Sequence, residues 1–140
     1  RGFKFNGNVT FIDSDFAIQM TDGSFFATRT MIGQPELTYN AALLFDRDRF
    51  SAKVAINHTG LKLTERVNTA ESYRNRYDTA STRVSLNAAF RLNSNWRVHA
   101  SVWNLTEEGR GEVLGKDQEI PIVQADFGAA YFVGFTYSFK

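Results

Sequence analysis

The chain has 140 residues, with 16 Lys and Arg against 15 Asp and Glu, and a formal net charge of +1 at pH 7. This length suits one domain with a modest core, and the even charge balance gives no reason to expect nucleic acid as a partner. The absence of cysteine excludes disulfide bonds, thiolate metal sites and cysteine nucleophiles.

Six stretches alternate between apolar and polar side chains, which is the pattern of β-strands with two different faces. In chain order they cover residues 3–11, 37–46, 50–58, 83–92, 96–105 and 131–140. The apolar faces carry no formal charge, whereas the opposite faces carry cations in mid-strand, namely Lys4, Lys53, Arg83, Arg91 and Arg97. No stretch reaches the roughly 18 apolar residues that a membrane helix needs, so the sequence predicts an all-β chain.

The links between these stretches alternate in length. Residues 46–49 and 93–95 form short polar turns, whereas three links are long, at residues 12–36, 59–82 and 106–130. An antiparallel up-and-down meander then has its short turns at one end and its long loops at the other, as outer-membrane barrels do. Each stretch also has about the 9 to 11 residues of a tilted membrane strand. Because aromatic residues lie near the strand ends, as in interfacial girdles, we expect part of a transmembrane β-barrel.

Three segments resemble the C-terminal part of the barrel of TonB-dependent outer-membrane receptors. They are GQPELTYNAALLFDRDRFSAKVAINHTG at residues 33–60, WRVHASVWNLTEE at 96–108 and GFTYSF at 134–139. Within the second segment, Asn104, Leu105 and Thr106 resemble the family's ending of the penultimate strand. The resemblance implies that residues 1–140 are the closing segment of a large barrel, without the plug domain and earlier strands.

The resemblance also implies a function and a set of partners. The function is energy-dependent uptake of a scarce nutrient, such as a ferric siderophore, a corrinoid or a carbohydrate, across the bacterial outer membrane. The implied partners are outer-membrane lipid, the remaining barrel strands and plug of the same receptor, TonB through the absent plug region, and the barrel-assembly machinery. That machinery reads the family's terminal aromatic residue, so the resemblance gives this role to Phe139, with Phe135 and Tyr137 in support. The alternative is that these three rings only face lipid.

A candidate for substrate contact lies in the second long link. Tyr73, Arg74, Arg76 and Tyr77 place two cations between two aromatic rings. Arginine forks suit carboxylates or phosphates, and aromatic faces suit sugars or catecholates. The alternative is a solvated loop that merely carries charge.

Signals for catalysis and metal binding are weak. His58 and His99 lie on separate predicted strands without the spacing of a metal site, and the acidic residues between positions 107 and 126 lack the ordered spacing of a calcium loop. We therefore expect no metal, no cofactor and no enzymatic activity.

Two alternatives to a transporter segment remain open at this point. The first is a small soluble barrel that binds an apolar ligand, as lipocalins do, with the apolar faces inward and the cations outward. The second is an eight-stranded structural outer-membrane protein, which requires two further strands near residues 25–31 and 120–127.

Overall fold

The computed structural model describes residues 2–14, 16–19, 22–28, 31–66, 74–115 and 120–139. The regular elements of these residues are all β-strands, so the predicted all-β class is confirmed. In the same part of the chain, no helix has the length and apolar character to cross a membrane.

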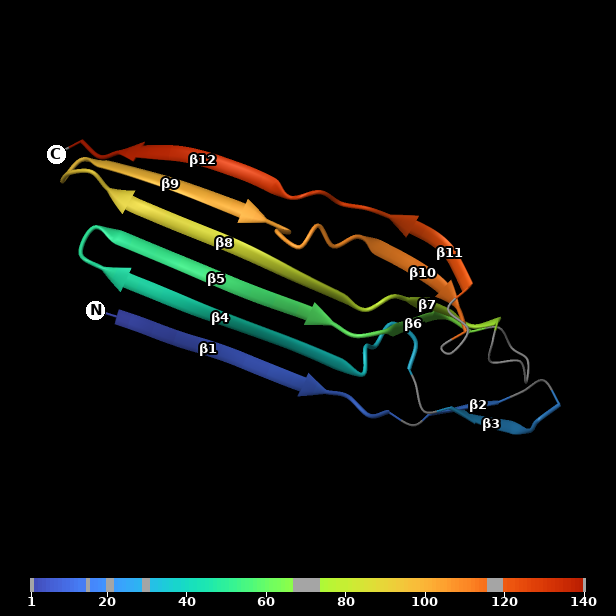
Figure 1. The fold of residues 1–140 in the computed structure, drawn as a ribbon. Helices are drawn as coiled ribbons and strands as arrows, with labels where there is room; N and C mark the ends of the chain where they lie inside the picture. The colour runs from blue at the N-terminus through green and yellow to red at the C-terminus, as the bar shows by residue number, and fades with distance from the viewer. Residues whose placement is uncertain are drawn as a thin grey trace.

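Six long strands form one antiparallel sheet in the order β1-β4-β5-β8-β9-β12. Their bounds are β1 Gly2–Phe11, β4 Leu37–Arg47, β5 Phe50–Thr59, β8 Ser81–Arg91, β9 Trp96–Trp103 and β12 Ala130–Tyr137. The order in the sheet is the order in the chain, so the sheet is a meander with β1 and β12 as its outer strands (Figure 1). The six predicted strands are confirmed, and most of their ends agree within two residues.

The register of the strands keeps the two kinds of side chain on opposite faces. One row across the sheet joins Phe5, Leu43, Val54, Leu86, Val102 and Tyr131, which lie opposite one another on successive strands. A second row, three residues further along the strands, joins Asn8, Asn40, Asn57 and Arg83. Because side chains alternate with a period of two, these rows belong to opposite faces. We call them the apolar face and the polar face.

Both short turns lie at the same end of the sheet, as predicted. In the first, Asp48 has a φ of 48°, a left-handed conformation that aspartate tolerates better than most residues. In the second, Asn93 Oδ1 accepts hydrogen bonds from the backbone N–H groups of Asn95 and Trp96, each at 2.9 Å. The Asn93 side chain thus supplies hydrogen bonds that the strand ladder lacks where the chain reverses.

The three long links are not plain loops, because each contains strands. Four of them form a second sheet in the order β11-β10-β7-β6, with bounds β6 Lys62–Glu65, β7 Arg76–Asp78, β10 Arg110–Leu114 and β11 Ile120–Ala125. They follow or precede β5, β8, β9 and β12 directly and keep the same lateral order, so this small sheet prolongs the long strands beyond the main sheet (Figure 1).

The remaining hairpin consists of β2 Phe16–Gln19 and β3 Phe25–Thr28. The two additional strands that the eight-stranded alternative requires, near residues 25–31 and 120–127, correspond to β3 and β11. However, β3 pairs with β2, and β11 pairs with β10. Neither strand widens the six-stranded sheet towards an eight-stranded barrel.

Buried apolar side chains lie in the small sheet. Leu63 is fully buried, Tyr77 and Val113 are nearly so, and Leu61 packs against them. In contrast, large apolar side chains on the main sheet are exposed, including Phe5 at 72% and Val133 at 82%. The apolar face of the main sheet therefore lacks a covering layer within the described chain.

Asn104 fastens the junction between the two sheets. Its side-chain Nδ2 donates to the backbone oxygens of Glu108 and Phe127 at 3.1 and 2.8 Å, and its Oδ1 accepts from Glu108 N at 3.1 Å. The next residue, Leu105, donates its backbone N–H to Val84 O at 2.8 Å. This short motif at the end of β9 thus ties together the links to β8, β10 and β12.

Candidate functional site

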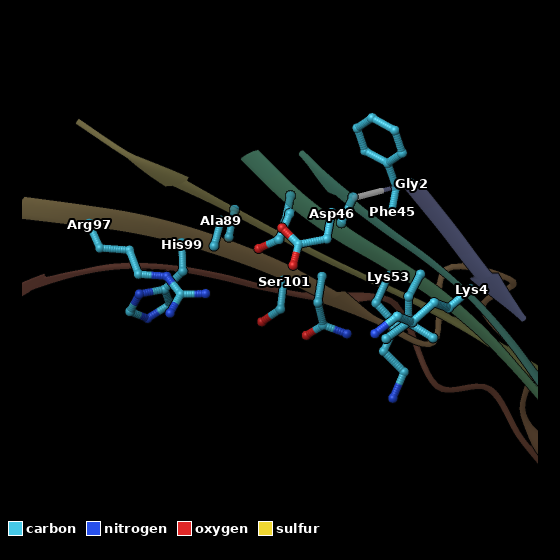
Figure 2. A pocket seen from close by; sticks show the side chains of 15 residues that line it. Gly2, Lys4, Phe45, Asp46, Lys53, Ala89, Arg97, His99 and Ser101 are labelled. Atoms are coloured by element: carbon cyan, nitrogen blue, oxygen red, sulfur yellow. The ribbon is translucent and has the colours of Figure 1, made fainter. Parts of the chain in front are cut away.

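The polar face is hollowed near the turn end of the main sheet. The hollow has a volume of about 370 Å³ and receives side chains from β1, β4, β5, β8 and β9. The polar residues that line it are Lys4, Asp46, Ser51, Lys53, Asn87, Arg97, His99 and Ser101. Figure 2 shows the Phe45 ring on the other side of the sheet from Lys53 and Arg97. The hollow therefore belongs to the charged side of the sheet.

This face carries an excess of positive charge. In the register, five cations share it with one carboxylate; the cations are Lys4, Lys53, Arg83, Arg91 and Arg97, and the carboxylate is Asp46. Among the residues that the structure describes, none of the five cations forms an ion pair.

His99 depends on a glycine in the neighbouring strand. Gly134 lies directly opposite His99 in the register of β9 and β12. A Cβ atom at position 134 would lie 2.5 Å from His99 Nε2, closer than two such atoms can approach. The glycine of the GFTYSF segment therefore leaves room for the imidazole ring against β12.

The predicted assembly residues form an aromatic cluster at the end of the chain. The Trp96 ring contacts the rings of Phe135 and Tyr137, with centroids 5.6 and 4.9 Å apart. Tyr137 also meets Phe139 edge to face at 4.7 Å. Phe139 is 88% exposed, so its ring is accessible to a partner. Recognition by the assembly machinery stays a prediction.

The predicted substrate-contact residues do not share one loop surface. Tyr73 lies outside the described residues, and Arg74 is exposed. The expected loop position is wrong for Arg76 and Tyr77, which lie on β7. Arg76 Nε is 3.3 Å from Glu65 Oε2. Substrate contact by these residues stays a prediction.

Tyr77 in particular is part of the core of the small sheet. It is only 9% exposed and packs with Leu63 and Val113. Its ring is held inside because the alternating strand directs it there. A strand of three residues is too short for its alternation to be recognised in the sequence, so the sequence predicts a loop at this position.

Sequence reasoning also missed an ionic cluster centred on Asp78. Lys62 Nζ lies 2.8 Å from Asp78 Oδ2, and Arg110 Nη2 lies 3.3 Å from Oδ1. Burial acts to raise the pKa of Asp78, but hydrogen bonding and charge attraction from Lys62 and Arg110 outweigh it, so the pKa lies below 3.8. The cluster joins β6, β7 and β10, and its members are too far apart in sequence to be matched by spacing.

His58 packs against neighbouring side chains at the end of the main sheet that is opposite the short turns. Its Nδ1 lies 2.8 Å from Thr82 Oγ1, and its ring stacks on Tyr39 with centroids 4.5 Å apart. Within the described ranges, no group of three or more His, Asp or Glu side chains is arranged to hold a metal ion.

Comparisons with protein-family models, with curated proteins and with solved structures each found no match.

Proposed function

We propose that this chain forms part of the wall of a transmembrane β-barrel in the bacterial outer membrane, and that the barrel is an active transporter of the TonB-dependent kind. Its cargo would be a scarce nutrient such as a ferric siderophore, a corrinoid or a carbohydrate. One observation carries the membrane part of the proposal: a six-stranded meander keeps an uncovered apolar face opposite a charged and hollowed face.

The apolar face needs a partner that covers a broad area. Fully burying one large apolar side chain contributes about 1.5–3 kcal/mol relative to leaving it in water. Phe5, Leu43, Val54 and Val133 all lie on this face and are well exposed. A bilayer covers such a face evenly. Four of the six strands, β1, β4, β5 and β8, have the length of roughly 9 to 11 residues that a tilted membrane strand needs, whereas β9 and β12 have 8 residues each.

The two outer strands, β1 and β12, each have one edge that pairs with no strand in the described chain. In the described chain, β1 pairs only with β4, and β12 pairs only with β9. Inside a bilayer every backbone N–H and C=O needs an internal partner. The proposal therefore requires further strands to pair with β1 and β12. The antiparallel order leaves these two strands running in opposite directions, as the ends of a closing meander must.

The position of the hollow weighs against a soluble binder of apolar ligands. Such a protein needs its apolar face turned inward around the ligand. Here the hollow lies beside Lys4, Lys53 and Arg97 instead. A polar interior and an apolar exterior are the arrangement of outer-membrane barrels. The more specific assignment to a TonB-dependent transporter relies on the resemblance of three segments.

Site-directed spin labelling tests the proposed orientation. The 140 residues contain no cysteine, so single cysteines introduced here can be labelled without interference from the chain. We would place Phe5→Cys and Val133→Cys on the apolar face, with Asn6→Cys and Ser101→Cys as matched positions on the polar face. The full-length protein would be reconstituted in lipid vesicles.

The expected result is an alternation in collision rates. Labels at positions 5 and 133 should collide readily with oxygen, which concentrates in lipid, and poorly with a water-soluble nickel chelate. Labels at positions 6 and 101 should show the opposite preference. Ready collision with the nickel chelate at all four positions would overturn the membrane assignment.

A further inference from the structure

We infer that Arg47, at the border of the apolar face, binds the phosphate group of an anionic phospholipid at the turn end of the main sheet. The inference names a lipid partner for the proposed membrane wall, and it rests on that proposed function. It concerns the apolar face alone, so it does not depend on what lies against the polar face.

The strand register places Arg47 on the apolar face. Arg47 is the last residue of β4 and lies opposite Phe50, the first residue of β5. The same row continues across β8, β9 and β12 through Phe90, Val98 and Phe135. Residues that lie opposite one another project to the same face. Arg47 is therefore the only Lys, Arg, Asp or Glu on the apolar face of the six long strands as the structure describes them.

Aromatic rings gather on the apolar face at the level of Arg47. The ring centroids of Phe3 and Phe45 are 4.8 Å apart, and those of Phe45 and Phe50 are 6.1 Å apart. On the other side of the sheet's midline, the rings of Trp96 and Tyr137 are in contact. Outer-membrane barrels carry such girdles of aromatic residues where hydrocarbon meets the headgroups. The rings therefore indicate a membrane interface at the turn end.

The length of β4 also places Arg47 at the headgroups. Arg47 is five residues from Ala42, the middle residue of β4, which is about 17 Å along a strand. With Ala42 at the midplane, a tilt of about 40° reduces this distance to roughly 13 Å along the membrane normal. The apolar band of an outer-membrane barrel is about 25 Å tall, so its border lies about 12–13 Å from the midplane. A flexible arginine side chain can reach the phosphates from there.

The contacts of Arg47 within the described chain leave its guanidinium open to a phosphate. Arg47 Nε is 4.0 Å from Asp48 Oδ2, and the two side chains are 75% and 57% exposed. An exposed pair at this distance contributes little. The planar guanidinium offers five donors in a fork that matches phosphate oxygens. In contrast, Lys62 in the small sheet lies 2.8 Å from Asp78 and is already paired.

An anionic headgroup suits this position better than a zwitterionic one, because a zwitterionic headgroup carries its own cation beside the phosphate. Near an anionic membrane surface, one arginine gains about fivefold in an equilibrium constant. Both short turns lie at this end of the sheet (Figure 1). The short turns of outer-membrane barrels face the periplasm, so the lipid would belong to the periplasmic leaflet.

Urea unfolding of the full-length protein in two kinds of vesicle tests the inference. One kind contains phosphatidylcholine alone, and the other contains phosphatidylglycerol in addition, with the same acyl chains. The test variant is Arg47→Gln. Arg49→Gln is the matched control, because Arg49 belongs to the same turn but lines a surface depression with Arg91 and Arg97 of the polar face.

Both substitutions would be made in an Asp48→Asn parent. Without Arg47, the carboxylate of Asp48 would itself repel anionic lipid and would exaggerate the effect. Asparagine tolerates the φ of 48° at this position. The folding equilibrium constant would be measured at low ionic strength by tryptophan fluorescence.

We expect phosphatidylglycerol to raise the folding equilibrium constant of the parent. Arg47→Gln should reduce this gain about fivefold, whereas Arg49→Gln should reduce it less than about twofold. An undiminished gain in Arg47→Gln, or an equal reduction in Arg49→Gln, would overturn the inference. Inorganic phosphate added to the phosphatidylcholine vesicles should give no such gain, and an equal gain from free phosphate would show that the assignment to a lipid is wrong.

The spin-label alternation, measured in the same vesicles, separates the two proposals. If the alternation is present but Arg47→Gln keeps the full gain, the headgroup contact is wrong and the membrane wall stands. If the alternation is absent, the membrane wall is wrong and the headgroup contact with it.

Discussion

Substituting an arginine on the apolar face tests whether this face contacts lipid or water, because the effect on the free energy of unfolding differs between the two. Val133 is suited to this test because it lies in the middle of β12 and is 82% exposed. Its exposed side chain makes few packing contacts that a substitution could break. If water surrounds it, Val133→Arg should change the free energy of unfolding by no more than about 0.5 kcal/mol.

In a bilayer the same substitution has a large cost. An arginine on the lipid face of a barrel destabilises it by about 2–4 kcal/mol near the midplane. That range corresponds to roughly 30- to 700-fold in the folding equilibrium. Asn6→Arg is the matched control, because Asn6 is exposed in the middle of the other outer strand and lies on the polar face. It should cost less than about 0.5 kcal/mol in either environment.

The assay is equilibrium unfolding of the full-length protein in urea with lipid vesicles present. Tryptophan fluorescence and heat-dependent gel mobility would report the folded fraction. The lipid interpretation requires Val133→Arg to lower the unfolding free energy by at least about 2 kcal/mol, with Asn6→Arg near zero. Equal and small effects of both variants would refute it.

Three further predictions concern the junction, the ionic cluster and the chain end. Asn104→Ala should lower the free energy of unfolding in urea by about 2–4 kcal/mol, because it removes several hydrogen bonds and forces alanine to adopt a φ of 56°. Asn104→Gly should recover the part of this loss that is due to the backbone conformation. Equal losses in the two variants would contradict this explanation. The pKa of Asp78 is lower in the folded than in the unfolded state, so its stabilising effect is present above pH 3.8 and is lost as the pH falls through the folded pKa. Asp78→Asn should therefore lower stability at pH 7 and flatten the acid limb of the pH–stability curve, and an unchanged acid limb would count against the cluster. If the assembly machinery reads the chain end, Phe139→Ala should reduce the amount of folded protein in the membrane fraction more than Phe11→Ala, although both rings are highly exposed. Equal amounts would argue against a recognition role.

The main sheet could be predicted because its pattern is long and repeated. Runs such as residues 3–11 and 50–58 alternate over enough positions to fix the face of each side chain, and the two short turns fix the antiparallel order. A shift of one residue would turn each apolar row to the polar side. The strand positions and the meander therefore followed from local information.

The small sheet could not be predicted in the same way. Its strands have only three to six residues, and its stability depends on contacts between distant segments, such as Leu63 with Val113 and Asp78 with Lys62 and Arg110. The sequence therefore misplaced Arg76 and Tyr77 in a loop. The hollow was missed for a related reason, because its lining comes from five strands that only their pairing brings together.

The location of the core links the two sheets to the proposed membrane setting. Leu63, Tyr77 and Val113 are buried by the small sheet itself, so this part can be stabilised in water by its own contacts. The main sheet has no comparable cluster within the described chain. Its apolar face consists largely of exposed or half-exposed Phe, Leu, Val and Ala side chains. The chain buries a compact apolar cluster beyond the ends of its long strands but leaves the apolar face of those strands uncovered. The two sheets are therefore suited to different surroundings, one to water and the other to a lipid bilayer. We therefore expect the small sheet to lie in water, beyond a main sheet whose apolar face alone contacts lipid.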